Sequence, residues 1–159
     1  MNAEYPSGPK SEWLNQAERI TSGDIATSAH DIPMLLEWLQ DMNWPGAPEI
    51  AEYLSRFGKD LVEPLRVVLQ SSDGIWKYWV LTSFATTTDK EFWVLLSGEL
   101  KAVAADIEDE EYANLEALYI IAMMNLEERT WIEEMLRVIR SRGLYDSFAF
   151  EKIEGLLKK

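Results

Sequence analysis

The stretch from Leu35 to Leu81 most constrains the fold, because it divides into short segments whose apolar residues recur at helical spacing. Two of these segments each place their apolar residues on one face: Ile50, Leu54 and Phe57 in the first, and Leu61, Leu65, Val68 and Leu69 in the second. A short helix with one apolar stripe cannot bury that stripe alone. Neighbouring segments must therefore pack against one another.

Residues that favour helix ends separate these segments. The helical region is disfavoured before a proline, as at Trp44-Pro45, whereas Pro48 suits the first turn of a helix. Gly58 is typical of a helix end, and the side chain of Asp60 is suited to cap the next helix. The pattern predicts a helix, a short turn and another helix, repeated.

The rest of the chain continues this pattern, and no run alternates with the period of two that a strand requires. The other predicted helices are residues 11–23 (cap Ser11, stop Gly23), 24–30, 32–39 (opened by Ile32-Pro33), 73–84 (cap Asp73), 89–107 (cap Asp89, one long helix over Phe92 to Ile107), 112–126, 131–143 (stop Gly143) and 146–157 (cap Asp146). We expect four tryptophans with apolar neighbours to lie in the core: Trp38, Trp79, Trp93 and Trp131.

A weak internal repeat supports stacked helix pairs. The run PMLLEWLQD that begins at Pro33 is similar to PLRVVLQSSD, which begins at Pro64. We therefore predict an all-α, HEAT-like α-solenoid of about eight to ten short antiparallel helices. Residues 11–159 would form this single helical-repeat domain, and residues 1–10, with two prolines and a glycine, would be a flexible N-terminal lead.

Within this stretch, LEWLQDMNWP (36–45), Phe57-Gly58, the helix containing Pro64 and IWKYW (75–79) resemble a bacterial family known as domain of unknown function 5071. The resemblance covers residues 31–83. It implies a small HEAT-like helical fold and transfers no catalytic residue. Some helical proteins of this kind resemble immunity proteins that neutralise secreted toxins, and this is a likeness of architecture alone.

Charge and composition exclude several classes of protein. The net charge of −13 disfavours binding to nucleic acid or to anionic lipid. There is no cysteine, hence no disulfide or thiolate site, and no run approaches the roughly 18 apolar residues of a membrane span. The first residues lack the features of a secretion signal, so we expect a soluble, cytoplasmic protein.

The sequence lacks the common motifs of catalysis. The sequence has no GxSxG, no glycine-rich phosphate loop and no HExxH, and its single histidine, His30, is expected to act in local capping or at the surface. Lys77, between aromatic residues, is expected to extend to the surface or to pair with a carboxylate. We therefore expect no enzyme activity, no cofactor and no metal.

The acidic segment containing Asp106, Glu108, Asp109, Glu110 and Glu111 is the main candidate site. Residues 106–134 contain ten acids and one arginine, whereas residues 135–159 contain six bases and three acids. Acids before a helix also stabilise its N-terminus and keep a protein soluble, so this alternative stays open. The functional interpretation is a surface for a basic partner protein, extended by four further acids if both helix starts share an edge: Glu127, Glu128, Glu133 and Glu134.

Two tryptophans beside turns are further candidates. Trp44 and Trp76 either pack the loops or anchor a partner. The leading hypothesis is a non-enzymatic intracellular protein-binding module, with neutralisation of a basic toxin domain by an immunity protein as its most specific form. The alternatives are a small-molecule or peptide sensor with an aromatic groove near these two rings, and a general helical-repeat adaptor.

Overall fold

The computed structural model describes residues 6–143 and 147–159, and within these residues the regular structure is entirely helical. The α-helices are α1 (Trp13–Thr21), α2 (Ile32–Leu36), α3 (Ala47–Leu54), α4 (Val62–Leu69), α5 (Gly74–Phe84), α6 (Lys90–Val94), α7 (Ser97–Ala104), α8 (Ala113–Met123), α9 (Arg129–Ser141) and α10 (Ser147–Leu157). Short 3₁₀ segments join some of them: η1 (Lys10–Glu12), η2 (Ala29–Asp31), η3 (Glu37–Gln40) and η4 (Ser55–Leu61). The all-α prediction is confirmed.

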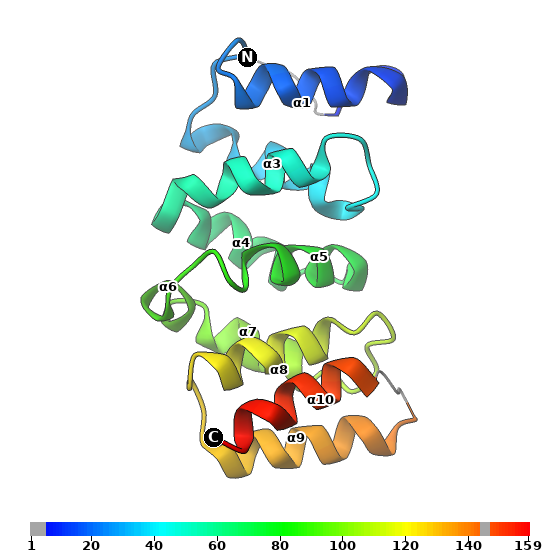
Figure 1. Ribbon diagram of the computed structural model, residues 1–159, viewed down its shortest axis with the longest axis vertical. Helices are drawn as coiled ribbons and strands as arrows, with labels where there is room; N and C mark the ends of the chain where they lie inside the picture. The colour runs from blue at the N-terminus through cyan, green and yellow to red at the C-terminus, as the bar shows by residue number, and fades with distance from the viewer. Residues whose placement is uncertain (1–5, 144–146) are drawn as a thin grey trace.

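The helices lie across the long axis of the molecule, in layers that follow the order of the chain (Figure 1). Helix α1 lies at one end of the stack, and α9 and α10 lie at the other. Because the chain crosses back and forth, its connections fall on two edges. The loop before α3, in cyan, and the loop before α8, in yellow-green, share one edge, whereas the loop between α8 and α9 lies on the opposite edge.

Several helix ends form where the local sequence predicts them. The Asp73 carboxylate accepts a hydrogen bond from the Trp76 N–H (2.9 Å), and the Asp89 carboxylate accepts one from the Phe92 N–H (2.8 Å). Pro48 lies in the first turn of α3. Gly58 interrupts η4 with a φ of 56°, which only glycine adopts readily. These signals act over three or four residues, so the sequence reveals them.

Two predicted caps are wrong. Helix α1 begins after Glu12, and Ser11 does not cap it, while α4 begins after Leu61 without a side-chain cap from Asp60. In both places a 3₁₀ segment leads directly into the α-helix, so backbone carbonyls already accept the first N–H groups. The predicted cap Asp146 lies outside the described residues.

The predicted helix over residues 24–30 is also largely absent. Only η2 forms there, because Ser28 and Asp31 make a capping box that starts the helical turn at Ala29. The Ser28 N–H donates to Asp31 Oδ2 (2.7 Å), and the His30 N–H donates to the Ser28 hydroxyl (3.3 Å). The remaining residues of the segment are irregular.

The long helix predicted over residues 92–107 is divided into α6 and α7. The break lies at Leu95 and Leu96, where the backbone makes tight bonds to Phe92 and Trp93 in place of α-helical ones. The Leu95 carbonyl accepts a hydrogen bond from Arg66 Nη2 (3.0 Å), which satisfies a group that the break frees. Apolar residues keep helical spacing on both sides of the break, so the sequence does not reveal it.

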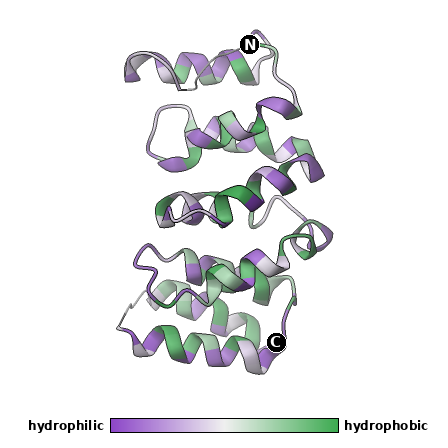
Figure 2. Ribbon diagram, turned by 180° about the vertical axis from the view of Figure 1, so that it is seen from behind, coloured by the Kyte–Doolittle hydropathy of each residue, from purple (hydrophilic) through white to green (hydrophobic). Residues whose placement is uncertain are grey.

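The core confirms most of the predicted tryptophans. Trp38 and Trp93 are fully buried, and Trp131 is half-buried against the core. The prediction for Trp79 is wrong, since its ring is only partly buried and lies outside the core cluster. Helix α5 is apolar around its circumference, but its neighbours cover only part of it. In contrast, polar and apolar residues alternate along α9, which closes one end of the stack (Figure 2).

The turn before α3 fixes how α1 meets the next layer. Gly46 has a φ of 90°, and a Cβ at this position would lie 2.5 Å from the Ala17 Cβ and 2.8 Å from the Trp38 ring. The same turn sets the Trp44 ring edge-on to Trp13, with 5.2 Å between the ring centroids. Only glycine fits here, because any side chain would collide with α1 or with the core.

Part of the predicted flexible lead is described. Residues 1–5 lie outside the described residues, whereas Ser7 exchanges two hydrogen bonds with the Gln16 side chain on α1. The Trp13 indole also donates to the Gly8 carbonyl (3.1 Å). Within the described residues, no helix combines the length and the apolar character needed to cross a membrane.

Candidate functional site

The predicted acidic cluster lies on the connection between α7 and α8, and we call residues 106–111 the acidic loop. Asp109 is its anchor, since its carboxylate accepts hydrogen bonds from the Glu111 N–H (2.9 Å) and the Asn114 N–H (2.8 Å). The Asn114 side chain donates in turn to the Asp106 carbonyl (3.0 Å). Asp109 is only 8% exposed. Its carboxylate therefore holds the loop and is not available to a partner.

The acidic loop packs against the start of α5. A Cβ added to Gly74 would lie 3.1 Å from Asp109 Oδ1 and 3.1 Å from the Glu111 Cγ. Asp73 caps the same helix. Several acids thus surround one helix N-terminus, where the free N–H groups favour negative charge. For Asp109, the structural alternative left open by the sequence accounts for its position.

The other acids of the loop face solvent. Asp106, Glu108, Glu110 and Glu111 are exposed, and Glu108 forms an ion pair with Arg142, just beyond the end of α9. Glu108, Glu110 and Arg142 also line a shallow hollow of about 350 Å³. The structure thus brings four of the predicted carboxylates together on a loop whose conformation is fixed from inside.

Glu127 and Glu128 do not extend this surface. They lie between α8 and α9, on the edge opposite the acidic loop (Figure 1). Glu127 pairs with Lys101 (2.7 Å), and Glu128 is exposed at the start of α9. An extended acidic surface requires that α8 and α9 begin on the same edge. They begin on opposite edges, because the two helices run in opposite directions.

Trp44 and Trp76 both take part in packing. The Trp76 indole donates a hydrogen bond to the Leu36 carbonyl (2.9 Å), so it ties α5 to the end of α2. Trp44 meets Trp13 edge-on, as described above. Both rings are half-buried, and neither lines any of the hollows described in this subsection. The aromatic groove remains a prediction, and none of these three hollows among the described residues corresponds to it.

Lys77 lies in a second polar region that sequence reasoning missed. It is 8% exposed, and in the part of the chain that the structure describes its ammonium has neither a hydrogen bond nor an ion pair. It lines a hollow of about 350 Å³ between α4, α5 and α7, together with Gln70, Ser71, Glu99, Val103 and Asp106. The only signal in the sequence was a lysine among the aromatic residues of IWKYW. The hollow itself depends on helices distant in the chain.

Glu99 is the acid of this hollow that already has partners. Arg66 Nη1 donates to its carboxylate (2.5 Å), and Gln70 Nε2 approaches the same oxygen at 3.4 Å. The hydrogen bond to Glu99 is the main reason that the pKa of Arg66 is raised above its ordinary value. Glu99 therefore neutralises Arg66 and is not the counter-ion of Lys77.

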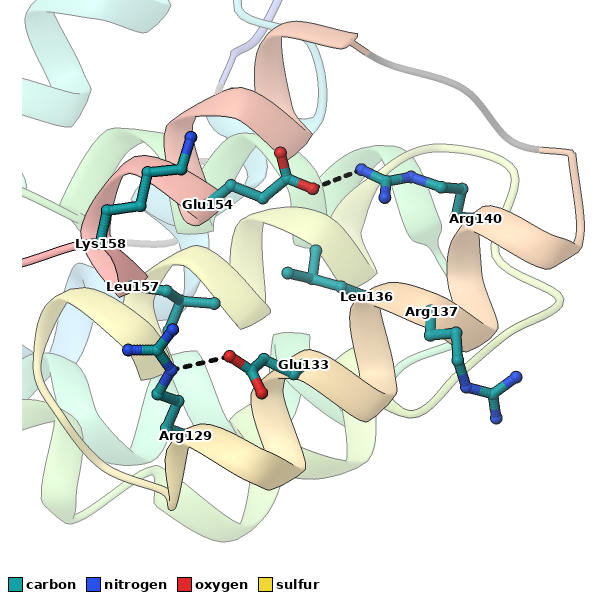
Figure 3. A pocket seen from close by; sticks show the side chains of 8 residues that line it. All are labelled: Arg129, Glu133, Leu136, Arg137, Arg140, Glu154, Leu157 and Lys158. Carbon is teal, nitrogen blue, oxygen red and sulfur yellow. Dashed lines mark hydrogen bonds and ion pairs between the residues drawn. The ribbon is translucent and has the colours of Figure 1, made fainter.

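A third hollow, of about 320 Å³, lies between α9 and α10 (Figure 3). Its apolar part is formed by Leu136 and Leu157, and two ion pairs flank it: Arg129 with Glu133 (2.7 Å) and Arg140 with Glu154 (2.6 Å). Arg137 points away from it (Figure 3). Both acids are paired with arginines and Arg137 pairs with Glu134, so Lys158 is the lining charge to which the structure gives no ion pair among the described residues.

Among the described residues, no three side chains of the kinds that bind metal ions are grouped as a metal site requires. Residues 14–118 match the model of a protein family described as "Domain of unknown function (DUF5071)". No curated protein and no solved structure matches the chain. The matched part extends beyond residues 31–83 on both sides, and it includes the acidic loop and the hollow around Lys77. Helices α9 and α10 lie outside it.

Proposed function

The chain belongs to the DUF5071 family, whose description assigns no activity, and we propose that it is a non-catalytic module that binds a basic protein partner on the acidic loop. The observation that carries this proposal is the contrast within the loop. Asp109 is buried and holds the backbone, whereas Asp106, Glu110 and Glu111 are exposed. A fixed set of exposed carboxylates binds a cationic surface with little loss of conformational freedom.

The scaffold of this module, in the same proposal, is a single HEAT-like α-solenoid. The layered order of the helices supports it, since α1 packs on α3 and α7 packs on α8. In such a scaffold each repeat contacts mainly its neighbours, and the turns between helices form continuous edges. The acidic loop would then be one turn of an edge on which a partner can lie.

The most specific form of the proposal is a bacterial, cytoplasmic immunity protein that covers the cationic site of a toxin domain. The net charge of −13 supports it, because such a charge attracts a basic partner over a distance and accelerates association. Binding of this kind weakens as salt is added.

A charge-neutralising variant with a matched control tests the proposal. We compare Glu110→Gln/Glu111→Gln with Glu49→Gln/Glu52→Gln, which removes the same charge from exposed positions on α3. A partner captured from the native host by the unmodified chain is then measured by calorimetry against all three proteins. We expect the acidic-loop variant to bind about tenfold more weakly, the control to bind normally, and the affinity of the unmodified chain to fall with salt.

Equal affinities of the two variants, or an affinity that ignores salt, would contradict the proposal. For the immunity form, the captured partner is expressed in the bacterium with and without the chain. The unmodified chain and the α3 control should restore growth, and the acidic-loop variant should not. If the partner inhibits growth and neither the unmodified chain nor the α3 control restores it, the immunity form of the proposal is wrong.

A further inference from the structure

We propose that the hollow around Lys77 binds a small zwitterion of the amino-acid class, with its carboxylate at Lys77 and its amino group at Asp106. This inference does not depend on the protein-binding proposal, although Asp106 belongs both to the acidic loop and to this hollow.

The ammonium of Lys77 is the first reason. An ammonium that reaches solvent but has no protein partner can exchange its water for the carboxylate of a ligand. Lys77 is 8% exposed because its stem is buried, and among the described residues its ammonium has no hydrogen bond and reaches an open hollow. Beside it, the Ser71 Oγ accepts the Asp73 N–H (3.3 Å), which leaves the hydroxyl hydrogen for an acceptor. Both donors suit the carboxylate of a ligand.

The opposite charge on the same hollow is the second reason. Asp106 lines it, and one oxygen of its carboxylate accepts the Glu108 N–H (3.2 Å). The other oxygen remains for a ligand donor. A simple anion would meet the carboxylates of Asp106 and Glu99 as well as Lys77, whereas a zwitterion complements both signs.

The size of the hollow sets the class of ligand. Its volume of about 350 Å³ lies at the lower end of the range for small-ligand sites, roughly 300–1,000 Å³. Its wall includes apolar side chains, Leu69 and Val103, against which a short aliphatic group would pack. An amino acid with a small side chain fits this combination, and a nucleotide does not.

Two tryptophans, Trp76 and Trp79, adjoin Lys77 on α5 and provide an optical signal. We titrate the full chain with glycine, L-alanine, L-serine and L-valine, and follow tryptophan emission and heat. Acetate and methylamine serve as probes that each keep one charged end. We expect at least one amino acid to bind, and both probes to bind at least about tenfold more weakly, since each lacks one ion pair.

Variants of the chain assign the binding to this hollow. We expect Lys77→Met and Asp106→Asn each to weaken amino-acid binding by about tenfold or more, because each removes one of the two charges. Lys59→Met, at an exposed lysine, should leave binding unchanged. If Lys77→Met fails to fold by circular dichroism, the Asp106→Asn result decides. Glu110→Gln/Glu111→Gln should bind the amino acid normally, which separates this test from that of the acidic loop.

Three results would overturn the inference. The first is that none of the four amino acids binds. The second is that acetate binds as tightly as the amino acid, which would make the hollow a plain carboxylate site. The third is that the variants at Lys77 and Asp106 bind as the unmodified chain does.

Discussion

Asp109 and Lys77 differ in one respect that decides what each does. Both are 8% exposed, and both lie along α5, Asp109 beside its first residue and Lys77 on the helix itself. The carboxylate of Asp109 accepts two backbone hydrogen bonds, whereas the ammonium of Lys77 has no partner within the described residues. A carboxylate that accepts internal hydrogen bonds maintains the fold, whereas an ammonium that has no protein partner and reaches solvent is available to a ligand.

The largest expected effect comes from removing the satisfied charge. Asp109→Ala leaves the N–H groups of Glu111 and Asn114 without an acceptor, and we expect the free energy of unfolding to fall by about 3 kcal/mol. Urea unfolding followed by circular dichroism measures this. Asp109→Asn keeps one oxygen and should lose about half as much. If the alanine variant loses less than about 1 kcal/mol, the carboxylate of Asp109 does not stabilise the fold as proposed.

Removing the unsatisfied charge should have the opposite sign. Lys77→Met keeps a similar length and apolar stem and removes an unpaired ammonium that is only partly withdrawn from water, so we expect the free energy of unfolding to rise by less than about 1 kcal/mol. The same urea experiment measures it, with Lys59→Met as the control for loss of one positive charge. A clear fall in stability would mean that Lys77 has a structural role like that of Asp109.

A glycine pair tests how tightly the acidic loop lies on α5. Gly74→Ala adds a Cβ 3.1 Å from Asp109 Oδ1, whereas Gly98→Ala adds one with no neighbour within 4 Å. Both glycines lie in the first turn of a helix. We expect Gly98→Ala to raise the free energy of unfolding by about 0.5 kcal/mol and Gly74→Ala to lower it by a similar amount. If both variants are stabilised, the loop is free to move away.

An exposed ion pair provides the smallest effect. The hydrogen bond from Arg137 lowers the pKa of Glu134 below its ordinary value. A lowered pKa in the folded state gives stability above the unfolded pKa of about 4.3, and this stability is lost as the pH falls through the lower folded value. Because both side chains are exposed, we expect little change in unfolding for Arg137→Gln. An NMR titration of the Glu134 carboxyl should show its pKa returning upward in that variant, and an unchanged pKa would exclude the pair.

The sequence was sufficient where a feature depends on near neighbours. The caps at Asp73 and Asp89, the proline in the first turn of α3 and the break at Gly58 each involve a few consecutive residues. Helical spacing then identified the apolar faces, and with them the all-α class. The acidic loop was also visible, because its acids are consecutive in the chain.

Apart from the caps at Ser11 and Asp60 and the helix over residues 24–30, which failed for local reasons, the predictions that failed concern contacts across the fold. The break at Leu95 is stabilised by Arg66 from α4, and the exposure of Trp79 depends on which side of α5 its neighbours leave uncovered. Glu127 is separated from the acidic loop by the direction of α8. The unpaired ammonium of Lys77 was not predictable, because α4 and α7, which are distant in the chain, form the hollow that it lines. None of these relations leaves a local pattern in the sequence.

The packing of α8 has a consequence for synthesis on the ribosome. Most of the layers contact the layer made just before them, so a nascent chain can complete each one as it emerges. Helix α8 is the exception, since it is buried on several sides and packs against α5, α7 and α10. Because α10 is translated after α9, the part of α8 that α10 covers stays exposed until both later helices have been made. During that interval a chaperone would have an exposed apolar surface of α8 to bind.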